Sequence, residues 1–93
     1  MLTKDAKYLI SLCTSFLESK ISAKYFCNNF ENYFVDDNND FTEEEAIIFD
    51  EILQDIAYFV PDKEERQAEP TYIDETELRK RTQVNLEKVS KLI

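Results

Sequence analysis

The absence of glycine is the feature that most constrains how this chain can fold. None of its 93 residues is Gly, and only two are Pro. Tight hairpin turns and left-handed turn positions depend on glycine more than on any other residue. A β-sandwich or β-barrel needs many such turns, so the sequence favours an all-α fold. The same absence excludes the glycine-rich loops that hold phosphate groups in many nucleotide-binding proteins.

The chain also lacks histidine, which removes most of the usual catalytic and metal-binding arrangements. No imidazole base, Ser-His pair or Cys-His pair can form. Cys13 and Cys27 are the only thiols, and two soft ligands are too few for a zinc site. We interpret both as small buried residues on neighbouring helix faces. We therefore expect neither catalysis nor a metal or other cofactor.

One acidic segment, residues 36–40, superficially resembles a calcium-binding loop. Counted from Asp36, the sixth position should be Gly but is Phe41. The twelfth position should be a bidentate Glu but is Ile47. Since both decisive positions fail, we interpret the segment as a solvated link whose Asp and Asn side chains cap helix ends.

Helix starts are indicated by capping residues. Thr42 and Glu45 have the spacing of a capping box, and Asp74 and Glu77 occupy the same two positions further along. Ser22 is placed to cap a third start. The short links predicted between the first three helices imply antiparallel neighbours.

Apolar residues support four amphipathic helices, because they recur at intervals of three and four. These positions are Ala6, Leu9, Ile10, Cys13, Phe16 and Leu17; Phe26, Phe30, Tyr33 and Phe34; Phe49, Ile52, Leu53, Ile56, Phe59 and Val60; and Leu78, Thr82, Leu86, Val89 and Ile93. Their boundaries predict helices over 4–19, 22–36, 42–60 and 74–92, with a longer link at 61–73 that can cross an end of the bundle. We predict a single domain, residues 1–93, folded as an antiparallel four-helix bundle.

The net charge of −9 is concentrated in the middle of the chain. Residues 31–70 contain fourteen acids against Lys63 and Arg66, whereas both flanking segments are slightly basic. Such a field repels nucleic acid and anionic membranes and attracts a basic protein surface. The alternative is that the acids only keep a small domain soluble. With no apolar run long enough to span a membrane and no signal pattern at the start, we expect a cytoplasmic protein.

The most informative stretch combines acids, two tyrosines and a proline over residues 55–62 and 69–74. Rigid aromatic rings make good interface anchors, and surrounding acids steer a basic partner. In the alternative interpretation, the tyrosines pack the end of the bundle with their hydroxyl groups in water. Asp74 is also expected to cap the last helix. The candidate binding residues are Asp55, Tyr58, Asp62, Glu65, Glu69, Tyr72 and Asp74.

Four short motifs, in this order, extend over nearly the whole chain. They are Leu9-Ile10 leading to Phe16-Leu17-Glu18-Ser19-Lys20-Ile21-Ser22, then Phe26, then Phe59-Val60-Pro61-Asp62, and finally Tyr72-Ile73-Asp74 with Leu78 and Leu86-Glu87-Lys88. In these motifs the chain resembles the colicin D-type immunity proteins, a family of small acidic helical proteins.

The resemblance implies a four-helix fold and a cognate partner, the nuclease domain of a toxin made by the same cell. The type member blocks a tRNA anticodon-loop nuclease by covering its basic cleft with acids that stand in for RNA phosphates. Related proteins protect against contact-dependent inhibition toxins. Asp62 matches the family acid expected to face the toxin's catalytic residues. A second family acid falls on Ala57, so Asp55 or Glu51 would have to replace it.

We therefore expect a monomer that forms a 1:1 heterodimer with its toxin and touches neither nucleic acid nor membrane directly. The second hypothesis is a small acidic adaptor that docks on a basic partner such as a transcription complex. The two differ in genetic context, because an immunity gene should lie beside the gene of a toxin that is lethal without it.

Overall fold

The structure is a computed structural model that describes residues 2–92. It contains the helices α1 (Lys4–Leu17), α2 (Ala23–Phe34), α3 (Glu43–Tyr58), α4 (Lys63–Arg66) and α5 (Glu75–Ser90). Across the described residues there is no β-strand, and the one isolated β-bridge joins Phe59 to Ile73. The predicted all-α class is confirmed.

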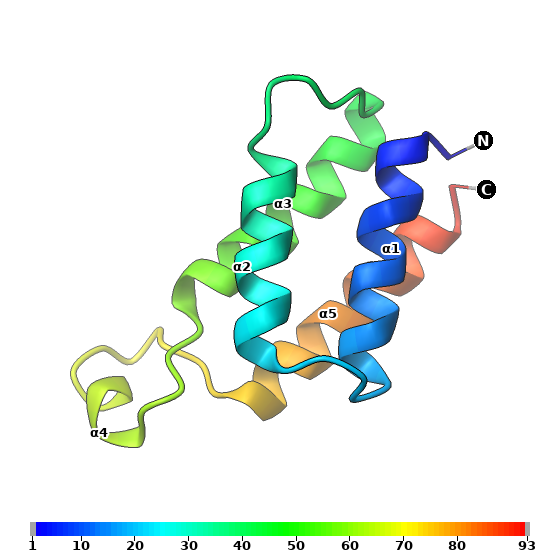
Figure 1. Ribbon diagram of the computed structural model, residues 1–93. Helices are drawn as coiled ribbons and strands as arrows, with labels where there is room; N and C mark the ends of the chain where they lie inside the picture. The colour runs from blue at the N-terminus through cyan, green and yellow to red at the C-terminus, as the bar shows by residue number, and fades with distance from the viewer. Residues whose placement is uncertain (1, 93) are drawn as a thin grey trace.

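The four long helices contact one another around a common core. α1 packs against α2 and α5, and α3 packs against the same two helices. Figure 1 shows α1 and α2 running in opposite directions, with α3 and α5 passing obliquely behind them. This arrangement is compatible with the predicted four-helix bundle, and a fully antiparallel order of the four helices stays a prediction.

The capping residues that predicted the helix starts are confirmed. The Ser22 hydroxyl accepts a hydrogen bond from the backbone of the first turn of α2, and Asp74 does the same for α5. Thr42 and Glu45 form the predicted capping box at the start of α3. α1 begins at Lys4 as predicted. α2, α3 and α5 each begin one residue after the predicted position, because the capping residue itself has an extended backbone.

The helix ends were predicted two residues too late. α1 ends at Leu17 because Ser19 adopts a left-handed backbone conformation with φ 61°. The amide of Ser19 donates to the Phe16 carbonyl, and the amide of Lys20 donates to the Ser15 carbonyl. These two hydrogen bonds make a Schellman motif, in which the position held by Ser19 is normally glycine.

The left-handed conformation of Ser19 allows a direct test of the cost of lacking glycine. Ser19→Gly is expected to raise the free energy of unfolding by about 1 kcal/mol, since glycine adopts this conformation without the steric penalty of a Cβ atom. Chemical denaturation followed by circular dichroism measures the change. Lys20→Gly, one residue later, is the control and should give no such gain. A variant less stable than the wild type would contradict this explanation of the helix end.

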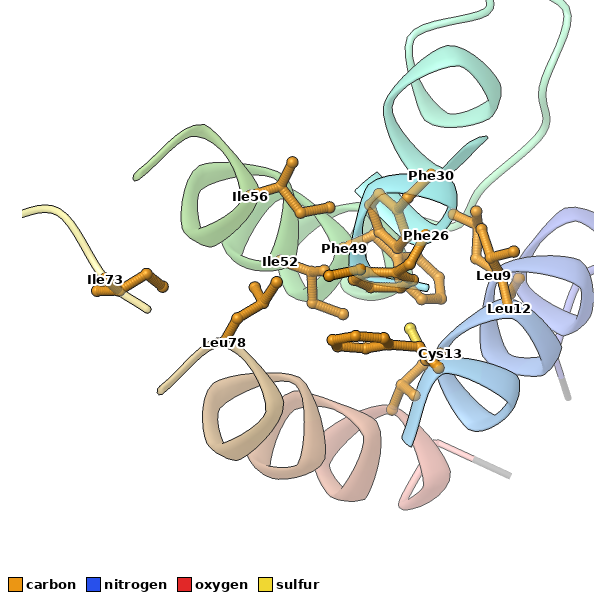
Figure 2. Packing of buried hydrophobic residues seen from close by; sticks show 14 residues of the cluster. Leu9, Leu12, Cys13, Phe26, Phe30, Phe49, Ile52, Ile56, Ile73 and Leu78 are labelled. Atoms are coloured by element: carbon orange, nitrogen blue, oxygen red, sulfur yellow. The ribbon is translucent and has the colours of Figure 1, made fainter. Parts of the chain in front are cut away.

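Most of the predicted apolar positions form the core, which is rich in phenylalanine (Figure 2). The rings of Phe16 and Phe26 stack with centroids 4.4 Å apart, and Phe30 meets Phe49 edge-on at 6.1 Å. The core therefore draws large rings from three helices, and such rings carry most of the buried area of a small domain. The fully or nearly fully buried apolar residues are Ala6, Leu9, Leu12, Cys13, Phe16, Ala23, Phe26, Phe30, Phe49, Ile52, Ile56, Ile73, Leu78 and Val89.

The two thiols differ in burial. Cys13 is buried as predicted, and desolvation raises the pKa of its thiol to about 12. Cys27 was also predicted to be buried but is only half-buried, and this burial raises the pKa of its thiol to about 11. Neither thiol has the lowered pKa of a reactive cysteine.

Two of the buried positions of α5 are polar, Thr82 and Asn85. Leu78 and Val89 lie in the core as predicted, and Leu86 is half-buried. Thr82 is fully buried, yet its hydroxyl oxygen has no hydrogen-bond partner within residues 2–92. Ile93, predicted to complete this face, lies outside the described residues.

One buried carboxylate fastens the start of α1 to the start of α3. Glu45 is 1 % exposed. Its carboxylate accepts hydrogen bonds from the Thr3 amide at 3.0 Å, the Thr3 hydroxyl at 2.7 Å and the Thr42 amide at 3.0 Å. Since Thr3 also caps α1, Glu45 links two capping residues that are 39 positions apart in the printed sequence.

A second carboxylate holds the 35–42 link. Asp5 accepts a hydrogen bond from the Tyr33 hydroxyl at 2.6 Å and another from the Asp40 amide at 2.7 Å. The hydrogen bond from Asp40 contributes most to the lowered pKa of Asp5, followed by that from Tyr33. The segment that superficially resembled a calcium loop is thus fixed by contacts within the protein.

Candidate functional site

Residues 59–74, which we call the acidic arm, project away from the four-helix core (Figure 1). The sequence suggested that this link could cross an end of the bundle, and the structure differs. The amide of Val60 donates to the Ile73 carbonyl at 3.0 Å, and the amide of Ile73 donates to the Tyr58 carbonyl at 2.9 Å. Because Ile73 is itself buried in the core, these bonds close the arm at its base and anchor it.

The arm is also braced from within. Arg66 donates through Nη1 to the carbonyls of Val60 at 2.8 Å and of Pro61 at 2.9 Å. Asp62 Oδ1 accepts from the amides of Glu64 at 2.8 Å and Glu65 at 3.4 Å, and so caps α4. The arm is a closed, internally bonded loop with one helical turn, not an open strand of chain.

Sequence reasoning missed α4, although its signal was present. Asp62 stands three residues before Glu65, which is the same Asp-x-x-Glu spacing that predicted the start of α5 at Asp74. The absence of an apolar stripe hid it, because four exposed or half-exposed residues, Lys63–Arg66, cannot show helical periodicity.

The carboxylates of the arm all face solvent. Within the described part of the chain none of them forms an ion pair. Asp62 and Asp74 accept backbone amides as helix caps, and Glu69 accepts the Thr71 amide at 3.4 Å. The two basic residues in the arm are Lys63 and Arg66, and Arg66 donates to backbone carbonyls and not to a carboxylate. The arm therefore has more negative than positive charge, and its exposed carboxylates are those of Asp62, Glu64, Glu65, Glu69 and Asp74.

Two tyrosines stand at the base of the arm. Tyr58 ends α3 and is 46 % exposed, while Tyr72 precedes the buried Ile73 and is 36 % exposed. Both rings are thus partly packed and partly available, so the anchor and packing interpretations both agree with their position. The structure brings six of the seven predicted residues, all but Asp55, onto the arm or its base.

Asp55 lies apart from the arm, on the side of α3 that faces α5. Its Oδ1 receives Arg81 Nη1 at 3.3 Å, and burial raises the pKa of Asp55 although this hydrogen bond opposes the rise. Arg81 Nε also pairs at 2.9 Å with Glu77, which was predicted to close a capping box with Asp74. Glu51 likewise pairs with Lys88 at 3.1 Å. Neither proposed replacement for the family acid at Ala57 is therefore a free carboxylate.

Over residues 2–92 no three side chains of the metal-binding types gather closely enough to hold an ion. None of the helices described is both long enough and apolar enough to cross a bilayer.

Asp74 accepts the Glu77 amide at 2.9 Å, which confirms its predicted role as a cap.

These features define a small helical protein whose distinctive surface is a braced acidic projection, a kind of surface that suits contact with a basic protein. The chain belongs to the bacterial self-protective colicin-like immunity family, whose model matches residues 6–89. This match covers nearly the whole chain and confirms the resemblance seen in the sequence. The chain is thus a self-protective immunity protein, and its family implies a cognate toxin as partner. No sequence among the curated proteins matches it.

Proposed function

We propose that this immunity protein binds the RNA-cleaving nuclease domain of its cognate toxin and blocks the basic cleft with the acidic arm. The observation that carries the proposal is the arm itself: solvent-facing carboxylates, Asp62 central among them, on a loop closed at its base. The proposed contact residues on the arm or its base are Tyr58, Asp62, Glu65, Glu69, Tyr72 and Asp74. Asp55 is a further candidate that lies apart from the arm and pairs with Arg81.

Charge and shape both suit this role. A nuclease cleft must be positively charged to hold RNA, so a concentrated set of carboxylates competes for the same groups that bind phosphates. An arm already braced by Arg66 and the Phe59–Ile73 bridge loses little conformational freedom on binding. We place this action in the cytoplasm of the producing cell. It requires no catalysis, no cofactor and no direct contact with nucleic acid or membrane.

The binding test uses the nuclease domain encoded beside this gene. We expect native mass spectrometry to show a 1:1 complex. We also expect the affinity measured by calorimetry to fall as the salt concentration is raised from about 50 to about 300 mM, because salt screens the attraction between exposed charges. Absence of binding at low salt would reject that domain as the target and favour the adaptor hypothesis.

A pair of double variants separates the arm from the overall charge. Glu64→Gln with Glu65→Gln removes two charges from the arm, and Asp36→Asn with Asp37→Asn removes two from the α2–α3 link. We expect the arm variant to lower the affinity by roughly tenfold and the link variant to change it by less than about threefold. Equal losses would show that net charge, and not the arm, attracts the toxin.

A further inference from the structure

A groove of about 280 Å³, which we call the α2–α3 groove, lies between α2 and α3 near the base of the acidic arm. On the α3 side its lining is aliphatic and consists of Leu53, Ile56 and Ala57, and on the α2 side Glu31 lines it. Ala57 is exposed and Leu53 is only half-buried, so a side chain that enters the groove contacts their surfaces directly. An incoming group therefore meets a mainly apolar wall.

The groove is open because the second half of α3 is not covered on this side. Near the middle of α3, Phe49 contacts the rings of Phe30 and Phe34 on α2. One turn further along α3, the residue of α2 that lines the space is Glu31, whose charged side chain is exposed and does not fill it. After Tyr58 the chain leaves the core as the acidic arm and does not fold back over this face (Figure 1).

The lining of the α2–α3 groove favours an aromatic or branched aliphatic occupant. An apolar cavity of about 150 Å³ is enough to bind benzene, so this groove has room for one such side chain. Burying that side chain against Leu53, Ile56 and Ala57 removes apolar surface of both molecules from water. A charged group would instead lose hydration against three side chains that can neither donate nor accept a hydrogen bond.

The toxin domain is the partner whose charge fits this position. Ala57 directly precedes Tyr58 at the base of the arm, so a partner seated on the arm lies next to the groove. Glu31 forms no ion pair within the described residues. A second copy of this chain would bring a net charge of −9 towards Glu31 and the arm, whereas a domain that binds RNA is basic and is attracted to them.

We infer that the α2–α3 groove receives one apolar side chain of the toxin domain and forms a second contact beside the acidic arm. The inference rests on the proposed function and adds the kind of group that the nuclease domain presents. The two contacts differ in their physical basis. Salt weakens the charge attraction of the arm, but it does not screen the burial of apolar surface in the groove. The groove therefore supplies the part of the affinity that persists at high salt.

The first test fills the groove without changing the charge. Ala57→Gln places a longer polar side chain there, at an exposed position of α3 where glutamine is compatible with a helix. Calorimetry with the neighbouring nuclease domain should give a Kd at least about tenfold higher at both low and high salt. The heat capacity change of binding should become less negative, because less apolar surface is buried. Ile47→Gln, on the same helix but outside the groove, is the control and should leave both quantities unchanged.

A second pair of variants keeps the test decisive if Ala57→Gln disturbs α3. Leu53→Ala removes part of the lining, and Leu86→Ala makes the same truncation at a half-buried position of α5 outside the groove. Both variants should lower the melting temperature by similar amounts, so a difference in Kd between them reports on the groove. Only Leu53→Ala should raise the Kd, by about fivefold.

The double variant of the arm, Glu64→Gln with Glu65→Gln, should show the opposite pattern. It should reduce the dependence of the Kd on salt, because it removes two exposed charges. It should leave the heat capacity change of binding unaltered, because the apolar contact is intact. The same change in both quantities for the arm and groove variants would contradict two separate contacts.

The results that would overturn the inference are distinguishable from failure of the proposed function. Wild-type Kd values for both Ala57→Gln and Leu53→Ala would reject the groove while leaving the arm as the site. A molecular mass that rises with concentration in sedimentation, and no longer rises in Ala57→Gln, would assign the groove to a second copy of this chain. No binding by the wild-type protein would reject the proposed function, and the inference with it.

Discussion

Replacing Glu45 with alanine is expected to lower the free energy of unfolding by about 2–4 kcal/mol. The change removes the acceptor of three hydrogen bonds and leaves their donors, on Thr3 and Thr42, without a partner. A domain of this size has a stability of only about 5–10 kcal/mol, so the loss is a large part of the total. Thermal unfolding followed by circular dichroism should show a melting temperature lower by roughly 10–20 °C.

The matched control is Glu44→Ala, one residue earlier in the same helical turn. Glu44 is exposed, so its loss should cost less than about 1 kcal/mol through the helix dipole alone. Equal destabilisation by the two variants would show that first-turn charge, and not the link to Thr3, makes Glu45 important.

The contribution of Glu45 should also depend on pH. Burial opposes its ionisation, but the hydrogen bonds from Thr3 and Thr42 outweigh burial and hold the pKa of Glu45 below its ordinary value. A carboxylate whose pKa is lowered by folding stabilises fully above its unfolded value, about 4.3, and loses this effect as the pH falls through the folded value. The stability difference between wild type and Glu45→Gln should therefore narrow below about pH 4. A difference in the free energy of unfolding between the two proteins that stays constant from about pH 7 to about pH 3 would contradict this linkage.

Reversing the charge at Asp62 is expected to weaken binding to the nuclease domain by roughly 100-fold or more. Asp62→Lys removes a carboxylate proposed to lie at the centre of the contact and places a cation against a basic cleft. The helical circular dichroism should be unchanged, because Asp62 is exposed and caps only the single turn of α4. Binding calorimetry at one fixed salt concentration measures the loss.

Asp62→Asn separates the charge of Asp62 from its capping role. Asparagine keeps an oxygen that can accept the amides of Glu64 and Glu65, so the arm retains its shape. We expect an intermediate loss of about tenfold for this variant. If Asp62→Lys protects a toxin-exposed cell as well as the wild type does, Asp62 is not in the contact.

The sequence predicted the long helices well because their signals are local. Ser22, Thr42 and Asp74 act as caps through the two or three residues that follow them, and apolar spacing marks the buried face of each helix. The helix ends were harder, since Ser19 takes a conformation that sequence pattern alone assigns to glycine. The position of this helix end depends on the backbone conformation of a single residue, which does not appear in the spacing of apolar residues.

The candidate site was predicted in composition but not in form. That acids gather in the middle of the chain is visible from the sequence, whereas their separation into the acidic arm and the ion pairs between α3 and α5 depends on non-local contacts. Arg66 bonding back to Val60, and Ile73 inserting into the core, convert the 61–73 link into a projection. Asp55 was grouped with the arm because it is near in sequence, yet Arg81 draws it towards α5.

The most direct test of the account is the cleavage of bulk tRNA by the neighbouring nuclease domain as this protein is added. We predict that cleavage falls in proportion to the added protein and stops at an equimolar ratio, while Asp62→Lys requires a large excess. Cleavage that continues undiminished at an equimolar ratio, with the complex present in the same sample, would contradict the claim that the acidic arm blocks the cleft.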